Sequence, residues 1–374
     1  MILPPATLGM LGGGQLGRYF VMSAHRLGYQ VIVLDPDPAS IAGAAADAQI
    51  VAAYDDAEAL RDLASRCDAV TCEFENVPAA SLALLEQHLP VRPAASAVRV
   101  CQDRREEKAF LTRAGVPVAP NLTLLPGEPL PALPSDLFPA ILKTAREGYD
   151  GKGQWTIHNA GELPAALAAS GVPCVLEKRL PLEGEFALTL ARSPSGAISA
   201  LPLVQNWHSG GILDQTRSPA NVPALEAEAQ RIAEHIIAAL DYVGVLTVEF
   251  FLVGGALLVN EMAPRPHNSG HPSIDNAGCS QFELQVRALC DLPLPAQAEV
   301  QPAILLNLLG DLWQDGTPDW AGALALPGVH LHLYGKGDAR PGRKMGHVTV
   351  TGRNWPTVEA TASQLRTLLG LPPR

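Results

Sequence analysis

The stretch from Gly244 to His271 holds the side chains of this chain best suited to chemistry. Two runs rich in Val, Leu and Phe flank Gly254-Gly255, a pattern that predicts a β-hairpin. Such a hairpin brings Glu249, Asn260 and Glu261 together. A loop of only Gly254-Gly255 in a regular ladder places Glu249 opposite Asn260, whereas a three-residue loop or a bulge places the two carboxylates opposite each other.

Facing carboxylates destabilise a bare sheet, but Mg²⁺ seeks one or two carboxylates together with substrate phosphates. The hairpin is therefore a candidate metal and nucleotide platform, with Glu249 and Glu261 as ligands; a surface hairpin with solvated carboxylates is the alternative. In the loop that follows, Pro264 and Pro266 exclude regular structure. That loop carries polar side chains beside the hairpin, namely Arg265, His267, Asn268, Ser269 and His271.

The N-terminus predicts a βαβ unit: a strand from Ala6 to Leu11, a helix from Arg18 to Leu27 and a strand from Tyr29 to Leu34. The glycine-rich turn between them, GGGQLG, has the form of a dinucleotide-binding fingerprint, completed by Asp35. A turn of this kind before a helix binds any anion. A structural turn, a substrate phosphate site at Gly14, Gln15 and Leu16, and an NAD site all remain open.

Further strands are predicted at 48–51, 69–72 and 90–92, which favours a doubly wound parallel sheet. Glu75 follows the strand at 69–72, where such sheets bind ligands, and could accept a hydrogen bond from an amine or a ribose hydroxyl. Capping of the helix that begins near Pro78 is the alternative.

The middle of the chain contains a second glycine-rich loop. A charged helix is predicted from Gln102 to about Ala114, and such a run is by default a solvated face. Residues 143–157 predict a strand, a loop and another strand, in which glycine amides and Lys152 could close on an anion; a plain mobile hairpin is the alternative. Strands follow at 175–180 and 186–191, and taken alone Glu177 and Glu185 are expected at the surface.

The last third adds a helix and a basic loop. Residues 223–240 have helical spacing, with Ala229, Ile232 and Ile236 on a face expected to pack under the hairpin. The sequence from Gly328 predicts two strands joined by a loop. In an otherwise acidic chain this loop gathers four cations that suit a phosphate, Lys336, Arg340, Arg343 and Lys344.

Length and composition limit the number of domains, the class of binding partner and the compartment. At 374 residues the chain predicts two or three domains, and its net charge of −11 argues against a general nucleic-acid or anionic-membrane binder. No signal peptide and no transmembrane span is expected. The six cysteines are scattered without a CxxC pair, which favours reduced thiols in a cytoplasmic protein.

Taken together, Lys143, the loop GYDGKGQ, the stretch EKRL, the carboxylates of the hairpin and MAPRPHNSGH resemble the ATP-grasp enzymes. More narrowly, GGGQLGR, EFENVP, QDR at 102–104, SQFE and GRKMGHVT are similar to the family of 5-(carboxyamino)imidazole ribonucleotide synthases. The resemblance covers nearly the whole chain. It implies an α/β ATP-grasp fold with a Rossmann-like N-terminal domain (1–105), an ATP-grasp domain (106–295, with a lid at about 106–180) and a small C-terminal domain (296–374) that completes the substrate site.

The resemblance also implies roles for individual residues. ATP is expected between the lid and the main sheet, bound by Arg104, Lys143, Gly148, Tyr149, Asp150, Gly151, Lys152, Gly153, Gln154, Glu177, Lys178, Arg179, Leu180, Glu185, His208, Asn260 and Glu261. Lys178 and Arg179 contribute through their backbone. The metal ligands are Glu249 and Glu261, for Mg²⁺ with Mn²⁺ as an alternative. Catalytic roles fall to Arg265, His267 and Lys152, and the substrate contacts are Gly14, Gln15, Leu16, Glu75, Asn268, Ser269, Lys336, Arg343 and Lys344. Glu147 stands where the family tends to have a small residue.

The implied reaction is the ATP-dependent carboxylation of 5-aminoimidazole ribonucleotide with bicarbonate in de novo purine biosynthesis, by a cytoplasmic homodimer. Arg265 suits a bidentate grip on bicarbonate, and His267 either accepts the proton of the amine or orients the substrate. The rival functions are another ATP-grasp ligase, an NAD-dependent oxidoreductase based on GGGQLG and Asp35, and a nucleotide-binding regulator without turnover.

Overall fold

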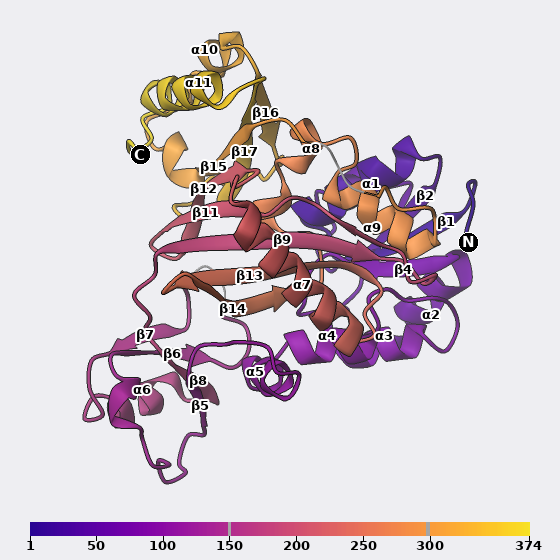
Figure 1. The fold of residues 1–374 in the computed structure, drawn as a ribbon. Coiled ribbons are helices and arrows are strands. Elements are labelled where there is room, and N and C mark those ends of the chain that lie inside the picture. The colour runs from indigo at the N-terminus through magenta and orange to yellow at the C-terminus, as the bar shows by residue number, and fades with distance from the viewer. Residues whose placement is uncertain (149–150, 297–299) are drawn as a thin grey trace.

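The computed structural model describes residues 1–148, 151–296 and 300–374 (Figure 1). Three sheets organise these residues: a four-stranded N-terminal sheet, a large central sheet and a four-stranded sheet at one end of the molecule. Tyr149 and Asp150, both predicted to bind ATP, lie outside the described residues.

The N-terminal sheet is parallel, in the order β3-β2-β1-β4. Its strands are β1 (Thr7–Leu11), β2 (Gln30–Leu34), β3 (Ala48–Ile50) and β4 (Ala69–Cys72), with helices α1 (Gln15–Arg26), α2 (Ala57–Arg66), α3 (Ala79–Leu85) and α4 (Ala95–Cys101). Strands β1, β2 and β4 are short, largely buried runs because helices cover both faces, whereas β3 is only partly buried. The strand predicted at 90–92 is reduced to an isolated parallel bridge between Val91 and Val70 of β4, formed by two backbone hydrogen bonds.

Helix α5 (Arg104–Arg113) leads into a separate antiparallel sheet, called the lid sheet below, with the order β5-β8-β6-β7. It consists of β5 (Asn121–Leu124), β6 (Ala140–Thr144), β7 (Gln154–Ile157) and β8 (Cys174–Lys178), covered by α6 (Leu163–Ser170). Leu142, Leu176 and Leu167 belong to its own small core, which lies apart from the main body in Figure 1.

The central sheet follows the order β14-β13-β9-β11-β12-β15-β17-β16, with β10 paired to β9. Its strands are β9 (Gly184–Arg192), β10 (Ile198–Ala200), β11 (Val204–Ser209), β12 (Ile212–Ser218), β13 (Gly244–Val253), β14 (Ala256–Ala263), β15 (Ala303–Leu309), β16 (Val329–Leu333) and β17 (Lys344–Thr351). The last three strands come from the C-terminal segment, so this segment extends the central sheet. The helices are α7 (Pro223–Ala239), α8 (Ser273–Asn276), α9 (Gln281–Cys290), α10 (Trp320–Ala325) and α11 (Trp355–Leu368), with 3-10 turns η1 (Gly43–Ala45), η2 (Ser135–Leu137), η3 (Asn268–Gly270) and η4 (Gly310–Trp313).

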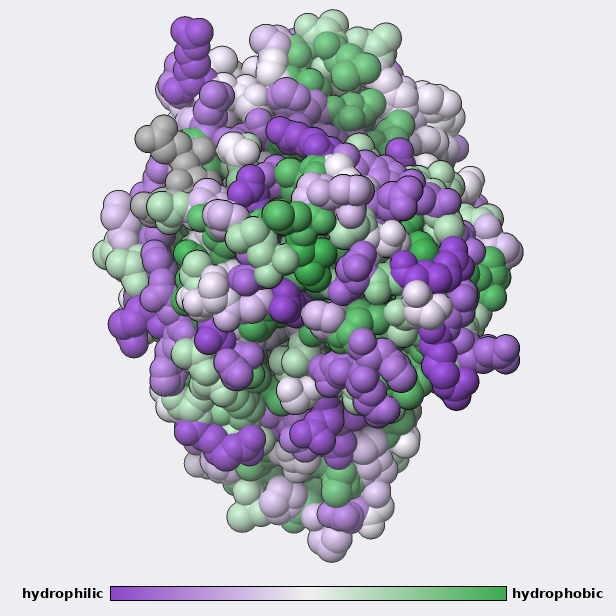
Figure 2. Space-filling model, turned by 90° about the vertical axis from the view of Figure 1, so that its right-hand side faces the viewer, coloured by the Kyte–Doolittle hydropathy of each residue, from purple (hydrophilic) through white to green (hydrophobic). Residues whose placement is uncertain are grey.

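Helices α7 and α9 connect the hairpin and the N-terminal unit to their surroundings in different ways. Ala229, Ile232 and Ile236 of α7 share a core with Val248 of β13 and Val259 of β14, which confirms the prediction that this helix packs on the hairpin. Helix α9 instead joins the N-terminal unit, because its apolar residues pack in one cluster with those of α1. The face drawn in Figure 2 intersperses hydrophilic and hydrophobic residues, with hydrophobic ones gathered near its middle. Among the described residues, no helix combines the length and apolar character needed to cross a membrane.

Candidate active site

The hairpin β13–β14 places the two predicted metal ligands face to face. Its loop is only Gly254-Gly255, both with positive φ (58° and 77°), as a tight two-residue hairpin turn requires. The ladder pairs Phe250 with Val259 but Glu249 with Glu261, so Asn260 is an extra residue in a bulge. The bulge shifts the register and brings the carboxylates opposite each other, as the second of the two predicted alternatives requires.

The two carboxylates differ in their partners. Glu261 accepts a hydrogen bond from Arg104 at 2.8 Å, and Glu249 lies 3.1 Å from Nε2 of His267. Burial, then the charge of Glu261, raises the pKa of Glu249. Burial would also raise the pKa of Glu261, but Arg104 and Lys143 outweigh it and hold this pKa below its ordinary value. Two crowded oxygen donors, one of them hard to ionise without a cation, have the chemistry of a site for a hard divalent ion.

His267 is neutral and held in one orientation. Burial, together with the charges of Arg265 and Lys344, lowers its pKa to about 3. Its Nδ1 lies 2.9 Å from Oγ of Ser269 and 3.4 Å from the Ser269 amide, which can only donate. We therefore assign the proton to Nε2, where it points at Glu249. This arrangement makes His267 a support for a carboxylate in the absence of substrate.

Arg265 is bound to Glu75 across the cleft between the hairpin and the N-terminal sheet. Nε of Arg265 donates to Glu75 at 2.5 Å, and Nη1 donates to the Pro266 carbonyl at 3.1 Å. Burial would raise the pKa of Glu75, but the guanidinium outweighs it and keeps the carboxyl ionised. Glu75 does not cap α3, whose N-cap Pro78 has no side-chain hydrogen bond. The ion pair instead joins two segments that are distant in sequence.

The nucleotide side contains a buried network that the sequence analysis partly missed. Glu177, 3% exposed, lies 3.0 Å from Lys143 and 3.6 Å from Lys108, so the expectation of a surface position is wrong. Lys143 also donates to Oδ1 of Asn260 at 3.4 Å, which connects the lid sheet to the hairpin. Burial lowers the pKa of Lys143, while Lys143 and Lys108 outweigh burial and lower that of Glu177.

Helix α5 is not a solvated face along its whole length. Glu107 and Lys108 are buried; Glu107 accepts from the Met262 amide at 2.6 Å and Lys108 donates to the Asn260 carbonyl at 2.7 Å. The available signal was spacing: Arg104, Glu107, Lys108 and buried Leu111 fall on one helical face. A charged stripe that shares a face with a leucine indicates burial beside charged partners.

The remaining predicted nucleotide residues surround this network. Nη2 of Arg104 lies 3.5 Å from the Gly148 carbonyl, and a Cβ at Gly151 would lie 3.1 Å from the carbonyl of Gly210, between β11 and β12. Glu185 lies 2.8 Å from Nδ1 of His208. Burial would lower the pKa of His208, but Glu185 and Glu249 outweigh it and raise this pKa.

The other nucleotide candidates are less enclosed. Lys152 is exposed but lines the cleft, Gln154 and Arg179 are exposed, Gly153 lies in the turn before β7, and Leu180 is half-buried. Lys178 pairs with Asp136 at 3.2 Å. The amides of Lys178 and Arg179 donate to Pro120 and Pro139.

The N-terminal glycine loop is filled by carboxylates of the chain itself. Glu73 accepts from the amides of Gly14 and Gly17, both at 2.6 Å, and Asp35 accepts from the amide of Gly13 at 2.6 Å. The acid of the fingerprint therefore binds the turn instead of a ribose, which argues against the NAD alternative. Gln15 and Leu16 still line the cleft.

One cleft of about 810 Å³ connects these groups. Its walls include Arg104, Glu261, Arg265, His267 and Asn268 on one side and Gln15, Leu16 and Glu75 on another. A third wall is the basic loop, defined as Tyr334 to Lys344, through Lys336, Arg340, Arg343 and Lys344. Lys336 donates to the Lys344 carbonyl at 2.9 Å and Arg343 to the Asp338 carbonyl at 2.8 Å, which order the loop. Ser269 is fully buried behind this surface.

Comparison with known proteins assigns each segment. The chain matches the models of the ribonucleotide synthetase preATP-grasp domain at residues 5–102, the ATP-grasp domain at 109–282 and the phosphoribosylaminoimidazole carboxylase C-terminal domain at 303–361. It is 40% identical to N5-carboxyaminoimidazole ribonucleotide synthase of Pseudomonas aeruginosa, over 97% of this chain and 99% of the relative.

Solved structures agree. The ADP complex of an N5-carboxyaminoimidazole ribonucleotide synthetase superposes with a TM-score of 0.91 and 37% identity, covering 98% of this chain and 97% of that one. N5-carboxyaminoimidazole synthase of Aspergillus clavatus, in complex with ADP and 5-aminoimidazole ribonucleotide, has a TM-score of 0.87 and 32% identity, covering 98% of this chain and 99% of that one. The fold predicted from the sequence, an ATP-grasp domain between a parallel-sheet N-terminal domain and a C-terminal domain, is confirmed.

Proposed function

The chain belongs to the N5-carboxyaminoimidazole ribonucleotide synthase family, and from this membership we propose that it carboxylates the exocyclic amine of 5-aminoimidazole ribonucleotide. ATP and bicarbonate are consumed and ADP and phosphate are released, a step of de novo purine biosynthesis. The product, N5-carboxyaminoimidazole ribonucleotide, is the same compound as 5-(carboxyamino)imidazole ribonucleotide. The chain is thus an ATP-grasp ligase that binds ATP and small-molecule substrates.

The observation that carries this proposal is the set of charged groups that line one cleft. Arg104 and Glu261 line it, and so do Lys336 and Arg343 of the basic loop. Arg265 lines the same cleft. A nucleotide bound by the first group and a ribonucleotide phosphate bound by the second would share this cleft with Arg265, whose guanidinium suits bicarbonate.

The carboxylate pair fits Mg²⁺. Glu249 and Glu261 supply opposed oxygen donors, and burial together with the facing charge of Glu261 raises the pKa of Glu249, a charge distribution that a dication would offset. When bound, the ion would neutralise charge on the ATP phosphates during phosphoryl transfer. Lys143 and the amides around Gly148 are assigned to the same phosphates. Mn²⁺ has the same oxygen preference and is the alternative.

We assign the remaining roles from contacts. Arg265 binds bicarbonate and the carboxyphosphate formed from it, and His267 is a positioning residue for Glu249. Lys152 belongs to the lid loop and would move toward the phosphates when the lid excludes water. Glu185, His208 and Asn260 complete the nucleotide site. Gln15, Leu16, Asn268, Lys336, Arg343 and Lys344 contact the ribonucleotide.

We also propose a division into domains at 1–105, 106–295 and 296–374, supported by the hydrophobic cluster of the C-terminal segment, which is distinct from those of the lid and of the hairpin. A cytoplasmic homodimer is proposed from the family resemblance. The large exposed hydrophobic side chains of the N-terminal unit, Met1, Leu3 and Met22, support self-association. Light scattering on the purified protein tests the dimer, and a monomer across the working concentration range refutes it.

ADP release from Mg²⁺-ATP with bicarbonate, measured with and without 5-aminoimidazole ribonucleotide, tests the activity. Strong stimulation by the ribonucleotide is expected. ATP binding without stimulation would instead favour another ATP-grasp ligase or a regulator, and would refute the proposed substrate.

A further inference from the structure

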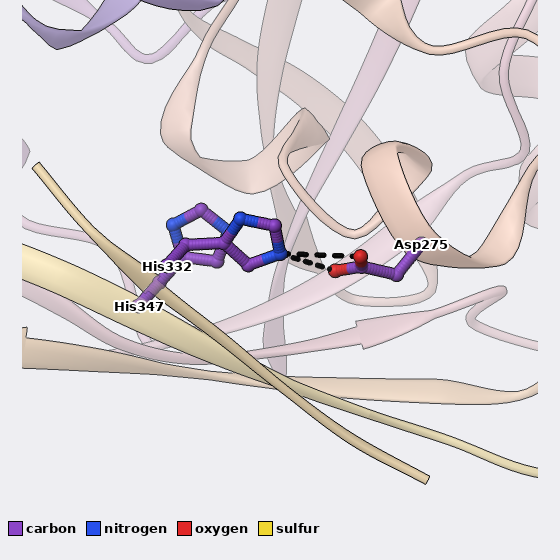
Figure 3. Close-up of side chains that lie close together, drawn as sticks. All are labelled: Asp275, His332 and His347. Atoms are coloured by element: carbon purple, nitrogen blue, oxygen red, sulfur yellow. Dashed lines mark hydrogen bonds and ion pairs between the residues drawn. The ribbon is translucent and has the colours of Figure 1, made fainter. Parts of the chain in front are cut away.

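A second group of potential metal ligands lies outside the carboxylate pair. Among the described residues, Asp275 of α8, His332 of β16 and His347 of β17 place one ligand atom each within 4.8 Å of one another (Figure 3). The antiparallel ladder pairs His332 directly with His347, so their side chains share one face of the sheet. His330 is two residues before His332, on the same face, and its Nδ1 lies 3.8 Å from Asp275.

One ring nitrogen of this group, Nε2 of His347, makes no hydrogen bond to the described residues. Nε2 of His332 contacts both oxygens of Asp275, at 2.9 and 3.1 Å. Nδ1 of His347 lies 2.9 Å from the Tyr334 hydroxyl. Nε2 of His347 is buried and has no hydrogen-bond partner among the described residues. A buried imidazole nitrogen is costly to leave without a partner, so this atom is available to a ligand.

We propose that Asp275, His332 and His347, with His330 as a fourth ligand, form a binding site for a divalent transition-metal ion, with Zn²⁺ as the expected occupant. Three imidazoles and one carboxylate match the nitrogen and oxygen ligands that Zn²⁺ prefers in four-coordinate sites. Mg²⁺ prefers an all-oxygen shell, so this site differs in selectivity from the pair Glu249 and Glu261.

The electrostatics suit a metal ion, because imidazole binds metal in its neutral form. Burial, followed by the neighbouring His271 and His332, lowers the pKa of His347 well below its ordinary value, so this ring is neutral at physiological pH. Asp275 supplies one negative charge, which partly offsets the charge of a dication. No lysine or arginine of the described residues forms an ion pair with Asp275 in this structure.

Binding requires a small rearrangement. The rings of His332 and His347 are stacked, with centroids 4.4 Å apart and planes inclined by 14°, so their lone pairs do not yet converge on one point. The ring that must turn is that of His332, whose side chain is partly exposed, because His347 is held by its contact with Tyr334. His330 is exposed and gives the ion a path from solvent.

A metal ion at this site would hold together the two strands from which the basic loop extends. His332 and His347 lie on the strands just before and just after that loop, and Asp275 belongs to the segment that follows the polar loop of the hairpin. The ion would join α8 to β16 and β17 and so fix the distance between Lys336 and Asn268 across the cleft. The expected effect is structural, a more rigid ribonucleotide end.

The test uses the full chain, stripped of metal, in excess Mg²⁺ so that the carboxylate pair is saturated with its own ion. Co²⁺, which reports nitrogen-rich four-coordinate sites through its visible absorption, is titrated and then displaced with Zn²⁺. Wild-type protein is expected to bind one equivalent and to gain thermal stability with Zn²⁺. His332→Ala should weaken binding at least about 10- to 100-fold, since even changes outside the ligand shell have that effect.

His88→Ala removes an exposed histidine in the N-terminal unit and is the matched control that should bind Co²⁺ like wild type. His330→Ala, also at an exposed position, tests the fourth ligand without risk to the core and should weaken binding less than His332→Ala. The proposal is overturned if wild type shows no saturable Co²⁺ absorption under Mg²⁺, or if His332→Ala binds Co²⁺ as tightly as wild type.

Discussion

Arg265→Lys is the change that tests the proposed bicarbonate site most directly. The guanidinium has five N–H groups, of which one donates to Glu75 and one to the Pro266 carbonyl. The others, on Nη1 and Nη2, would form the parallel fork that we assign to bicarbonate. Lysine keeps the charge but offers a single ammonium, which cannot bind Glu75 and bicarbonate in the same geometry.

The size of the effect follows from the hydrogen bonds at stake. A hydrogen bond to a charged group contributes about 1.5–3 kcal/mol. Loss of one such bond to the reacting carboxylate in the transition state lowers kcat/KM for bicarbonate roughly 10- to 150-fold, and loss of both bonds of the fork lowers it further. Glu75 retains a cationic neighbour, so the fold should persist, and thermal unfolding checks this.

The assay is ADP release at saturating ATP and 5-aminoimidazole ribonucleotide, with bicarbonate varied. Arg231→Lys is the matched control, because Arg231 is exposed on α7, on the far side of the core from the cleft. It should leave kcat/KM unchanged. Wild-type kcat/KM for bicarbonate in Arg265→Lys would remove Arg265 from the bicarbonate site.

Four further outcomes are expected. Glu261→Gln removes one of two facing carboxylates and should raise the Mg²⁺ concentration needed for ADP release at least about tenfold; an unchanged Mg²⁺ dependence would count against the metal assignment. Glu177→Gln leaves Lys143 and its neighbouring lysine buried without a carboxylate, which should cost about 3–5 kcal/mol of stability and lower Tm; an unaltered Tm would show that the network is solvated. Burial raises the pKa of Glu107 from 4.5 to about 7, so its stabilising contribution is complete below about pH 4.5 and is lost as pH rises through about 7. Wild-type Tm should therefore fall between about pH 4.5 and about pH 7 by more than that of Glu107→Gln, and parallel curves would contradict the buried carboxyl. Glu147 has φ of 59°, so Glu147→Gly should raise stability by about 1 kcal/mol, and a lower Tm would show that the side chain compensates the strain.

Local sequence patterns predicted helices and strands well where a single local preference, such as a glycine pair in a tight turn, determines the structure. The hairpin at 244–263 followed from β-branched residues on either side of a glycine pair, and both glycines adopt positive φ. The register did not follow, because a bulge at Asn260 has no local sequence signal of its own. Family resemblance and the chemistry of facing carboxylates identified the correct alternative.

Burial of charge was the main failure. Glu177 and Lys108 look like surface residues because each stands among other charged residues in the sequence, and their burial depends on the pairing of Glu177 with Lys143 and Lys108 in space. Pairing between segments that are far apart in the chain cannot be deduced from one sequence by periodicity. Only the spacing of Arg104, Glu107, Lys108 and Leu111 gave a local indication that this face is covered.

The N-terminal glycine loop shows why a phosphate-binding pattern need not bind a dinucleotide. Its amides have the geometry to bind an anion, and Glu73 and Asp35 satisfy three of them from within the chain. A Cβ at Gly12 or Gly14 would lie 2.2 or 2.6 Å from an atom of Glu73, so these glycines are needed to admit that carboxylate. The loop thus holds β1 and β4 together at the edge of the cleft. A substrate phosphate must then be bound mainly by cations, and the basic loop near the other end of the chain contributes four of those that line the cleft. This division explains why the C-terminal strands join the central sheet: the N-terminal unit forms a wall of the ribonucleotide site, and the C-terminal segment supplies its charge.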